Sequence, residues 1–175
     1  MTRLKSASVL LILLIFTVSC IKDIDFDQID DLTFATPLSV SFVYVEVDQS
    51  VFLDANNQEI SHVIDESDIQ IIDFLSHAED NVITIVTYLT NTIDREFVIE
   101  YEFYDAQNQL VMISDSMLIQ PNSTNLTYEM SYTYAQLENV TRVRTSIRML
   151  PGVPLRPLLD RNLSIDSTIN MNYEY

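Results

Sequence analysis

The chain has 175 residues, a formal net charge of −17, one glycine and one cysteine. Such an excess of acidic residues repels phosphate groups, which argues against nucleic acid as a partner. The single cysteine excludes a disulfide within the chain, and the single glycine, Gly152, excludes glycine-rich nucleotide-binding loops.

The first segment has the layout of an export signal. Arg3 and Lys5 precede an uncharged apolar run from Val9 to Val18, and the small residue Ser19 follows before Cys20. The run is shorter than the roughly 20 residues that a membrane-spanning helix needs. We therefore predict a signal peptide over residues 1–19.

The end of this segment, Thr17-Val18-Ser19-Cys20, resembles the lipobox of bacterial lipoproteins. The resemblance implies cleavage before Cys20, diacylglycerol on its thiol, and acylation of the new amino terminus, for example with palmitate. Several acyl chains hold a protein durably on a membrane. The alternative is an ordinary cleaved signal followed by a chance cysteine.

Residues 20–36 follow with alternating acidic and apolar side chains but no sustained strand or helix period, which indicates a tether. Its alternating aspartates lack the glycine and glutamate positions of an EF-hand loop, so no metal site is predicted. We assign residues 37–175 to one folded domain.

The sequence pattern of the folded domain predicts β-strands. Hydrophobic residues make up 47% of the chain, enough to build a core. Four segments alternate apolar and polar side chains with a period of two, and three more carry apolar residues on both faces. The clean segments are Phe97–Tyr104, Leu126–Thr133, Arg142–Met149 and Ile165–Glu174, and the others are Leu38–Val47, Val82–Leu89 and Gln109–Ser114.

Asparagine and aspartate, which tolerate left-handed backbone, occupy the intervening turns in place of glycine. About seven short strands with regular turns predict an all-β fold, an antiparallel β-sandwich of immunoglobulin-like or fibronectin-like topology. Residues 65–80 fit either a short helix or a strand.

Few residues suit catalysis. His62 and His77 are the only histidines, both in predicted loops, so neither a zinc site nor a serine hydrolase triad is predicted. We predict no catalytic residue, metal or cofactor. A pair of carboxylates for glycoside hydrolysis remains open among the 26 acidic residues.

The positively charged residues of the predicted domain are concentrated near its carboxyl-terminal end. Arg142, Arg144 and Arg148 share one face of a predicted strand, and Arg156 and Arg161 follow. Such a stripe suits an anionic ligand. The favoured alternative is cross-strand pairing with outward-facing acidic residues, for which the candidates are Glu100, Glu102 and Glu129.

Several short motifs resemble an uncharacterised family of small Bacteroidetes lipoproteins of the flavobacterial kind. The lipobox, the acidic run IKDIDFDQIDD and the segments TNTIDREF and FYDAQN carry this resemblance. It implies a location and a fold but no activity. Lys22-Asp23 resembles the surface-export signal of that phylum, and Asp115-Ser116-Met117 and Asp166-Ser167-Thr168 resemble its O-glycosylation pattern, which implies Ser116 and Ser167 as acceptors.

Two hypotheses for function follow. The first is a non-catalytic module, lipid-anchored in the cell envelope at the outer membrane, that binds a glycan or an envelope protein. Tyr44, Tyr104 and Tyr134 are its candidate stacking residues. The second is a carbohydrate-active envelope hydrolase that uses a carboxylate pair.

Overall fold

The structure is a computed structural model that describes residues 35–69, 82–157 and 159–174. The described residues form one compact unit. The predicted signal peptide, Cys20, most of the predicted tether and the larger part of the 65–80 segment, with His77, lie outside the described residues.

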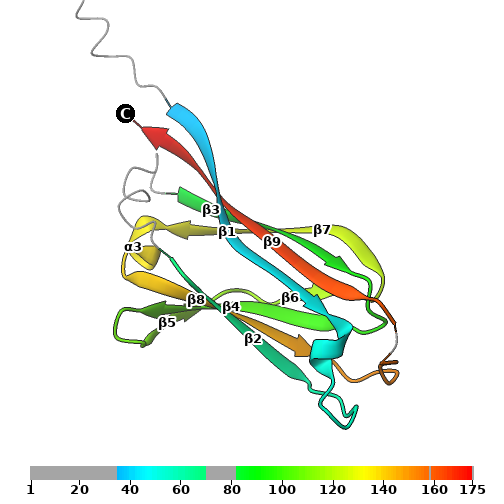
Figure 1. Cartoon of the computed structure of the whole chain (residues 1–175). Helices are drawn as coiled ribbons and strands as arrows, with labels where there is room; N and C mark the ends of the chain where they lie inside the picture. Colours follow the sequence, from blue (N-terminus) through cyan, green and yellow to red (C-terminus); the bar gives the residue numbers. More distant parts are fainter. Residues whose placement is uncertain (1–34, 70–81, 158, 175) are drawn as a thin grey trace, which may run out of the picture. The chain divides into compact units, whose positions relative to one another are not determined.

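Two antiparallel sheets face each other as a sandwich (Figure 1). We call them the upper and lower sheets, as they lie in Figure 1. The upper sheet has the order β1 (Ala35–Asp48), β9 (Asn162–Glu174), β3 (Val82–Asn91), β7 (Ser123–Thr133). The lower sheet has the order β2 (His62–Asp68), β8 (Val140–Met149), β4 (Phe97–Asp105), β5 (Leu110–Ile113), and β6 (Met117–Ile119) also pairs with β4.

The all-β antiparallel sandwich is therefore confirmed, whereas the detailed topology differs from the prediction. Except for β4, β5 and β6, which all lie in the lower sheet, consecutive strands alternate between the sheets. The first and last strands pair with each other, and the whole order is that of a jelly roll. An immunoglobulin-like sandwich instead keeps its first two strands in one sheet. Alternation along a strand reveals its buried face but not its neighbours, so the sequence could not distinguish the two topologies.

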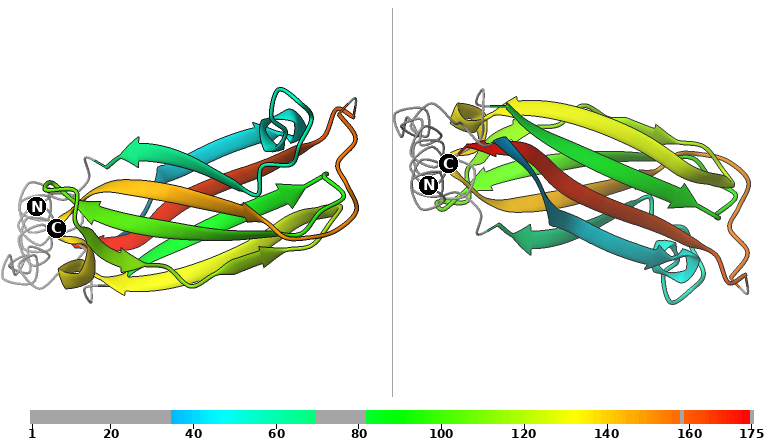
Figure 2. Two further views of the ribbon diagram at one scale, coloured as in Figure 1. Left: turned by 90° about the horizontal axis from the view of Figure 1, so that it is seen from below. Right: turned by 90° about the horizontal axis from the view of Figure 1, so that it is seen from above.

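The described residues contain nine strands rather than seven, because β2 and β6 were not predicted. Two short helices join strands: the 3-10 helix η2 (Gln49–Phe52) after β1, and α3 (Tyr134–Leu137) after β7. Figure 2 shows from two further directions that β1 and β9 run side by side. No described helix is long and apolar enough to cross a membrane.

Asparagine supplies the left-handed backbone that tight turns need. Every described non-glycine residue with a positive φ is an asparagine, namely Asn57, Asn108, Asn122 and Asn125. Asn108 and Asn122 lie in turns that the sequence predicted, whereas Asn125 lies within β7, where its register with β3 shifts. Asp54 and Asp105 each accept two backbone N–H groups within their own turn, at 2.7–2.9 Å. Side-chain hydrogen bonds therefore stabilise turns that commonly rely on glycine.

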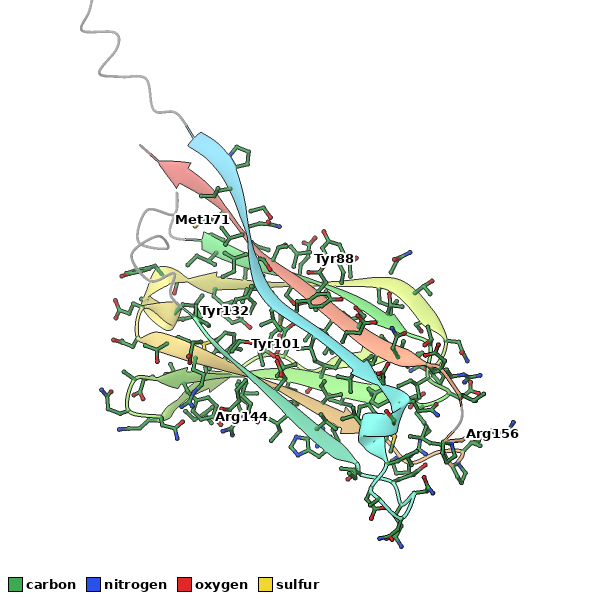
Figure 3. All side chains as sticks on the ribbon, viewed as in Figure 1. Tyr88, Tyr101, Tyr132, Arg144, Arg156 and Met171 are labelled. Atoms are coloured by element: carbon green, nitrogen blue, oxygen red, sulfur yellow. The ribbon has the colours of Figure 1, made fainter. Side chains whose placement is uncertain are left out.

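The core contains one polar cluster that joins the sheets. Tyr101 of β4 is fully buried, as the sequence pattern predicted. Its hydroxyl lies 2.5 Å from Ser167 Oγ of β9 and 3.2 Å from Thr87 Oγ1 of β3, and these two oxygens are 3.0 Å apart. Burial raises the pKa of Tyr101, so the phenol stays protonated and able to donate. We call these three residues the hydroxyl triad; Figure 3 shows Tyr101 between the sheets.

Removing the tyrosine hydroxyl should weaken the sandwich. We expect Tyr101→Phe to lower the free energy of unfolding by about 1–2 kcal/mol, because Thr87 and Ser167 each lose a buried hydrogen-bond partner. Denaturant unfolding of the full chain measures this. Tyr88→Phe, which removes the hydroxyl of an exposed ring, is the matched control, and equal stability of the two variants would contradict a role for the triad.

Candidate functional site

The predicted arginine stripe lies on the outer surface of the lower sheet. Arg142, Arg144 and Arg148 all belong to β8, which lies between β2 and β4. The register places Arg144 opposite Glu66 of β2 and opposite Glu102 of β4. A cation in the middle of the sheet therefore has a carboxylate on either side.

Arg144 is the centre of this cluster. Its Nε and one terminal nitrogen donate to Glu66 Oε1 at 2.8 and 2.7 Å, and the other terminal nitrogen donates to Tyr104 Oη at 2.9 Å. Glu102 lies 3.5 Å away, and the guanidinium stands 4.7 Å from the centroid of the Tyr104 ring. The hydrogen bond to Glu66 raises the pKa of Arg144. Its donors are thus committed to this chain's own groups.

The other two arginines of the stripe have fewer contacts than Arg144. Arg142 lies 3.5 Å from Glu66 and donates to Asn108. Arg148 is exposed, lies opposite Val98 and His62, and has no ion pair with any described residue. The structure therefore does not bring the three predicted residues together as one open anion site.

The three acidic residues that were predicted to pair with the stripe differ in position and contacts in the structure. Glu102 reaches Arg144, whereas Glu100 accepts a hydrogen bond from Ser116 and Glu129 belongs to the other sheet. The main partner, Glu66, was missed because β2 was not recognised as a strand. His62 begins this strand rather than lying in a loop, and its Nε2 is 2.9 Å from Ser146 Oγ.

The two predicted glycosylation serines have opposite environments. Ser116 is exposed between β5 and β6, and its hydroxyl donates to Glu100 Oε1 at 2.5 Å. Ser167 is fully buried in the hydroxyl triad. The folded sandwich has no space for a sugar on Ser167, so this part of the prediction conflicts with the structure.

A second cluster lies on the outer surface of the upper sheet. Tyr44 of β1 pairs with Asp166 of β9, and Asp166 pairs on its other side with Tyr88 of β3. The three side chains form a row across the strands, which we call the tyrosine row. Tyr44 is 62% exposed and Tyr88 is 48% exposed. Figure 3 shows Tyr88 on the upper sheet and Arg144 on the lower one.

The ring of Tyr44 has a defined orientation. Its hydroxyl donates to Glu46 Oε2 at 3.0 Å, and Glu46 Oε1 accepts from Asn162 Nδ2 at 2.7 Å. Glu46 lies two residues further along the same face of β1, so the ring must lie along the strand to reach it. The hydrogen bond to Glu46 raises the pKa of Tyr44, and the charges of Glu46 and Asp166 add to this effect.

The sequence identified only part of this row. Tyr44 was a candidate, but Tyr88 was missed because Val82–Leu89 carries apolar residues on both faces. Of the other candidates, Tyr104 is covered by the arginines and donates to Glu102, while Tyr134 packs against the core. The signal that could have identified Tyr88 is its position in the alternation along β3, which directs its side chain outward, as it does for Asp166 and Tyr44 on their own strands.

The surface around the tyrosine row is polar and without positive charge. None of the four upper-sheet strands contains a lysine or an arginine. Outward residues near the row include serines, threonines and an asparagine, namely Ser39, Ser41, Thr84, Thr90, Thr127, Ser131, Ser164, Thr168 and Asn170. These groups both donate and accept hydrogen bonds.

Two further arginines, Arg95 and Arg161, form ion pairs at one end of the sandwich. Arg95 is buried, pairs with Glu59 at 2.8 Å, and donates to the carbonyl oxygens of Leu150 and Val153. Arg161 pairs with Asp94 at 2.7 Å. A hydrogen bond from Asn122, with Arg161, lowers the pKa of Asp94. Within the described ranges, no group of three or more histidine, cysteine or acidic residues is placed to hold a metal ion.

Comparison with known proteins does not assign the chain to a family. No family model matches the chain, and no curated protein matches it in sequence. Among solved structures, a Parabacteroides distasonis protein assigned as secreted is similar over 63% of this chain and 38% of its own length, with 10% identity and a TM-score of 0.46.

Two further structures are similar at the same level. VP2 of infectious bursal disease virus covers 80% of this chain with 33% of its own, at 6% identity and a TM-score of 0.42. The prophage-derived protein YomS covers 79% with 96% of its own, at 9% identity and a TM-score of 0.39. The chain thus spans well under half of the first two proteins. Similarities this distant support no inference about function.

The ion pairs of Arg144 should contribute to stability. We expect Arg144→Gln to lower the melting temperature, because it leaves Glu66 and Glu102 as adjacent unneutralised charges on one sheet face. The matched control is Arg148→Gln, on the same strand and face, which should leave the melting temperature unchanged. The difference should shrink in high salt. If both variants melt like the unaltered chain, the arginine is not structural.

Proposed function

We propose that the chain is an exported lipoprotein, anchored through Cys20 in the cell envelope, that binds a ligand without transforming it. The apolar run, the lipobox and the absence of a predicted catalytic constellation support this proposal. The observation that carries it is the tyrosine row: two exposed aromatic rings that flank one carboxylate on a face without lysine or arginine.

The binding surface belongs to the upper sheet rather than to the arginines. Arg142 and Arg144 are occupied by Glu66, Glu102 and Tyr104, so an anionic ligand would have to displace these contacts. Exposed tyrosines are instead typical anchors of recognition surfaces, because they present a large contact area with few rotatable bonds.

A hydrolase that uses two carboxylates finds less support at this row. Asp166 is its one carboxylate, and the nearby Glu46 is bound by both Tyr44 and Asn162. An acid and a base must instead act on opposite sides of the same scissile bond. Binding alone therefore accounts for the row.

The anchor is tested by Cys20→Ala in the full chain. We expect this variant to leave the membrane fraction or to accumulate as an uncut precursor, because no thiol remains to carry the lipid. Membrane fractionation with an immunoblot for precursor and mature lengths measures this. A variant that is processed and membrane-bound as before would rule out lipidation at Cys20.

The binding role is tested with the double variant Tyr44→Ala, Tyr88→Ala. We expect detergent-extracted full-length protein with these changes to lose most of its co-sedimentation with envelope fragments of the source cells. The matched control is Ile64→Ala, which removes an exposed apolar side chain from the opposite sheet and should bind normally. Unchanged binding of the double variant would refute the surface, and release of soluble sugar during incubation would support a hydrolase instead.

A further inference from the structure

We propose that the tyrosine row binds an uncharged polysaccharide chain that lies across the strands, with successive sugar rings over Tyr44, Asp166 and Tyr88. This inference rests on the proposed function and names the ligand of the same surface. The row supplies stacking platforms at both ends and a hydrogen-bond acceptor between them.

The spacing of the row suits such a chain. Tyr44 and Tyr88 are separated by one intervening strand, which places them about 9.5 Å apart, twice the usual distance between neighbouring strands. A pyranose ring is about as wide as one strand spacing, so about three consecutive sugars cover the row. The first and third then lie over tyrosine rings, and the second lies over Asp166.

The orientation of Tyr44 suits stacking. Because its hydroxyl is tied to Glu46, and Glu46 to Asn162, the ring is held along β1 with a large exposed area. The apolar C–H face of a sugar can pack on such a ring without a conformational change in the protein. A ring fixed beforehand loses less entropy on binding than one that must be ordered by the ligand.

The polar groups of the surface match hydroxyl groups. Asp166 is exposed and can accept hydrogen bonds from two adjacent sugar hydroxyls, since a carboxylate has several acceptor sites. Thr127 continues the same row beyond Tyr88, and Ser164 and Thr168 lie on either side of Asp166 along β9. The apolar face of a sugar can therefore pack on a tyrosine ring while the hydroxyl groups at its edge form hydrogen bonds with the neighbouring polar side chains.

Charge decides which polysaccharides fit. The upper-sheet strands contain no lysine or arginine, while Glu46, Asp166 and Glu129 face outward on this surface. An acidic polymer such as alginate would be repelled both here and by the overall charge of −17. An uncharged chain pays no such penalty.

The test is isothermal titration of the detergent-extracted full-length protein. The probes are neutral polysaccharides, including a soluble cellulose derivative, a β-1,3-glucan, a galactomannan and starch, with alginate as the acidic counterpart. We expect at least one neutral polymer to bind and alginate not to bind. In oligosaccharides of that polymer, affinity should rise sharply between the disaccharide and the trisaccharide, because only the latter reaches both rings.

Variants locate the binding. Tyr44→Ala and Tyr88→Ala should each weaken affinity by about tenfold or more, the effect expected for a central aromatic anchor. Tyr44→Phe, which keeps the ring, should bind more tightly than Tyr44→Ala, and Ile64→Ala should match the unaltered chain. Binding that is insensitive to both tyrosines would overturn the inference.

The outcomes also separate this inference from the proposed function. If no neutral polysaccharide binds, yet envelope binding depends on the tyrosines and is abolished by protease treatment of the fragments, the ligand is a protein. The polysaccharide inference then fails while the binding module stands. If envelope binding itself ignores both tyrosines, the proposed function fails as well.

Discussion

The hydrogen bonds between Tyr101, Thr87 and Ser167 constrain the strands that carry the tyrosine row. They connect β4 of one sheet to β3 and β9 of the other through the buried core. Side chains alternate along a strand, so an inward Thr87 requires Tyr88 to face outward, and an inward Ser167 requires the same of Asp166. The register then places Tyr44 beside Asp166. The buried triad and the exposed tyrosine row thus share two strands, β3 and β9, and lie on opposite faces of them.

The sandwich separates its charges between its two outer faces. The lower sheet carries Arg142, Arg144 and Arg148, and the first two are balanced by carboxylates of neighbouring strands. The upper sheet has no basic residue in its strands, and its outer face is largely hydroxyl and amide groups around two tyrosines. The charged face therefore serves mainly the fold, while the uncharged groups of the other remain available for a ligand.

Particular residues show what the sequence could and could not predict. Alternation over Phe97–Tyr104 correctly placed Tyr101 in the core and Glu102 on the outer face, because strict alternation of apolar and polar residues identifies the two faces of a strand. Ser167 was misplaced by a three-residue surface motif, although it shares parity with the buried Ile165 and Ile169. The half-exposed edge strand β2 gave too weak a pattern, so Glu66 was missed. Strand order, and with it the tyrosine row, depends on contacts distant in sequence that local patterns do not contain.

Binding at the tyrosine row is tested most directly by nuclear magnetic resonance. The detergent-extracted full-length protein, with labelled tyrosine rings, is titrated with a neutral trisaccharide. We expect the ring signals of Tyr44 and Tyr88 to shift together and to saturate at the same concentration. The signals of Tyr104, on the opposite face, and of the buried Tyr101 should stay unchanged. Shifts at Tyr104 without shifts at Tyr44 and Tyr88 would contradict the assignment of binding to the upper sheet.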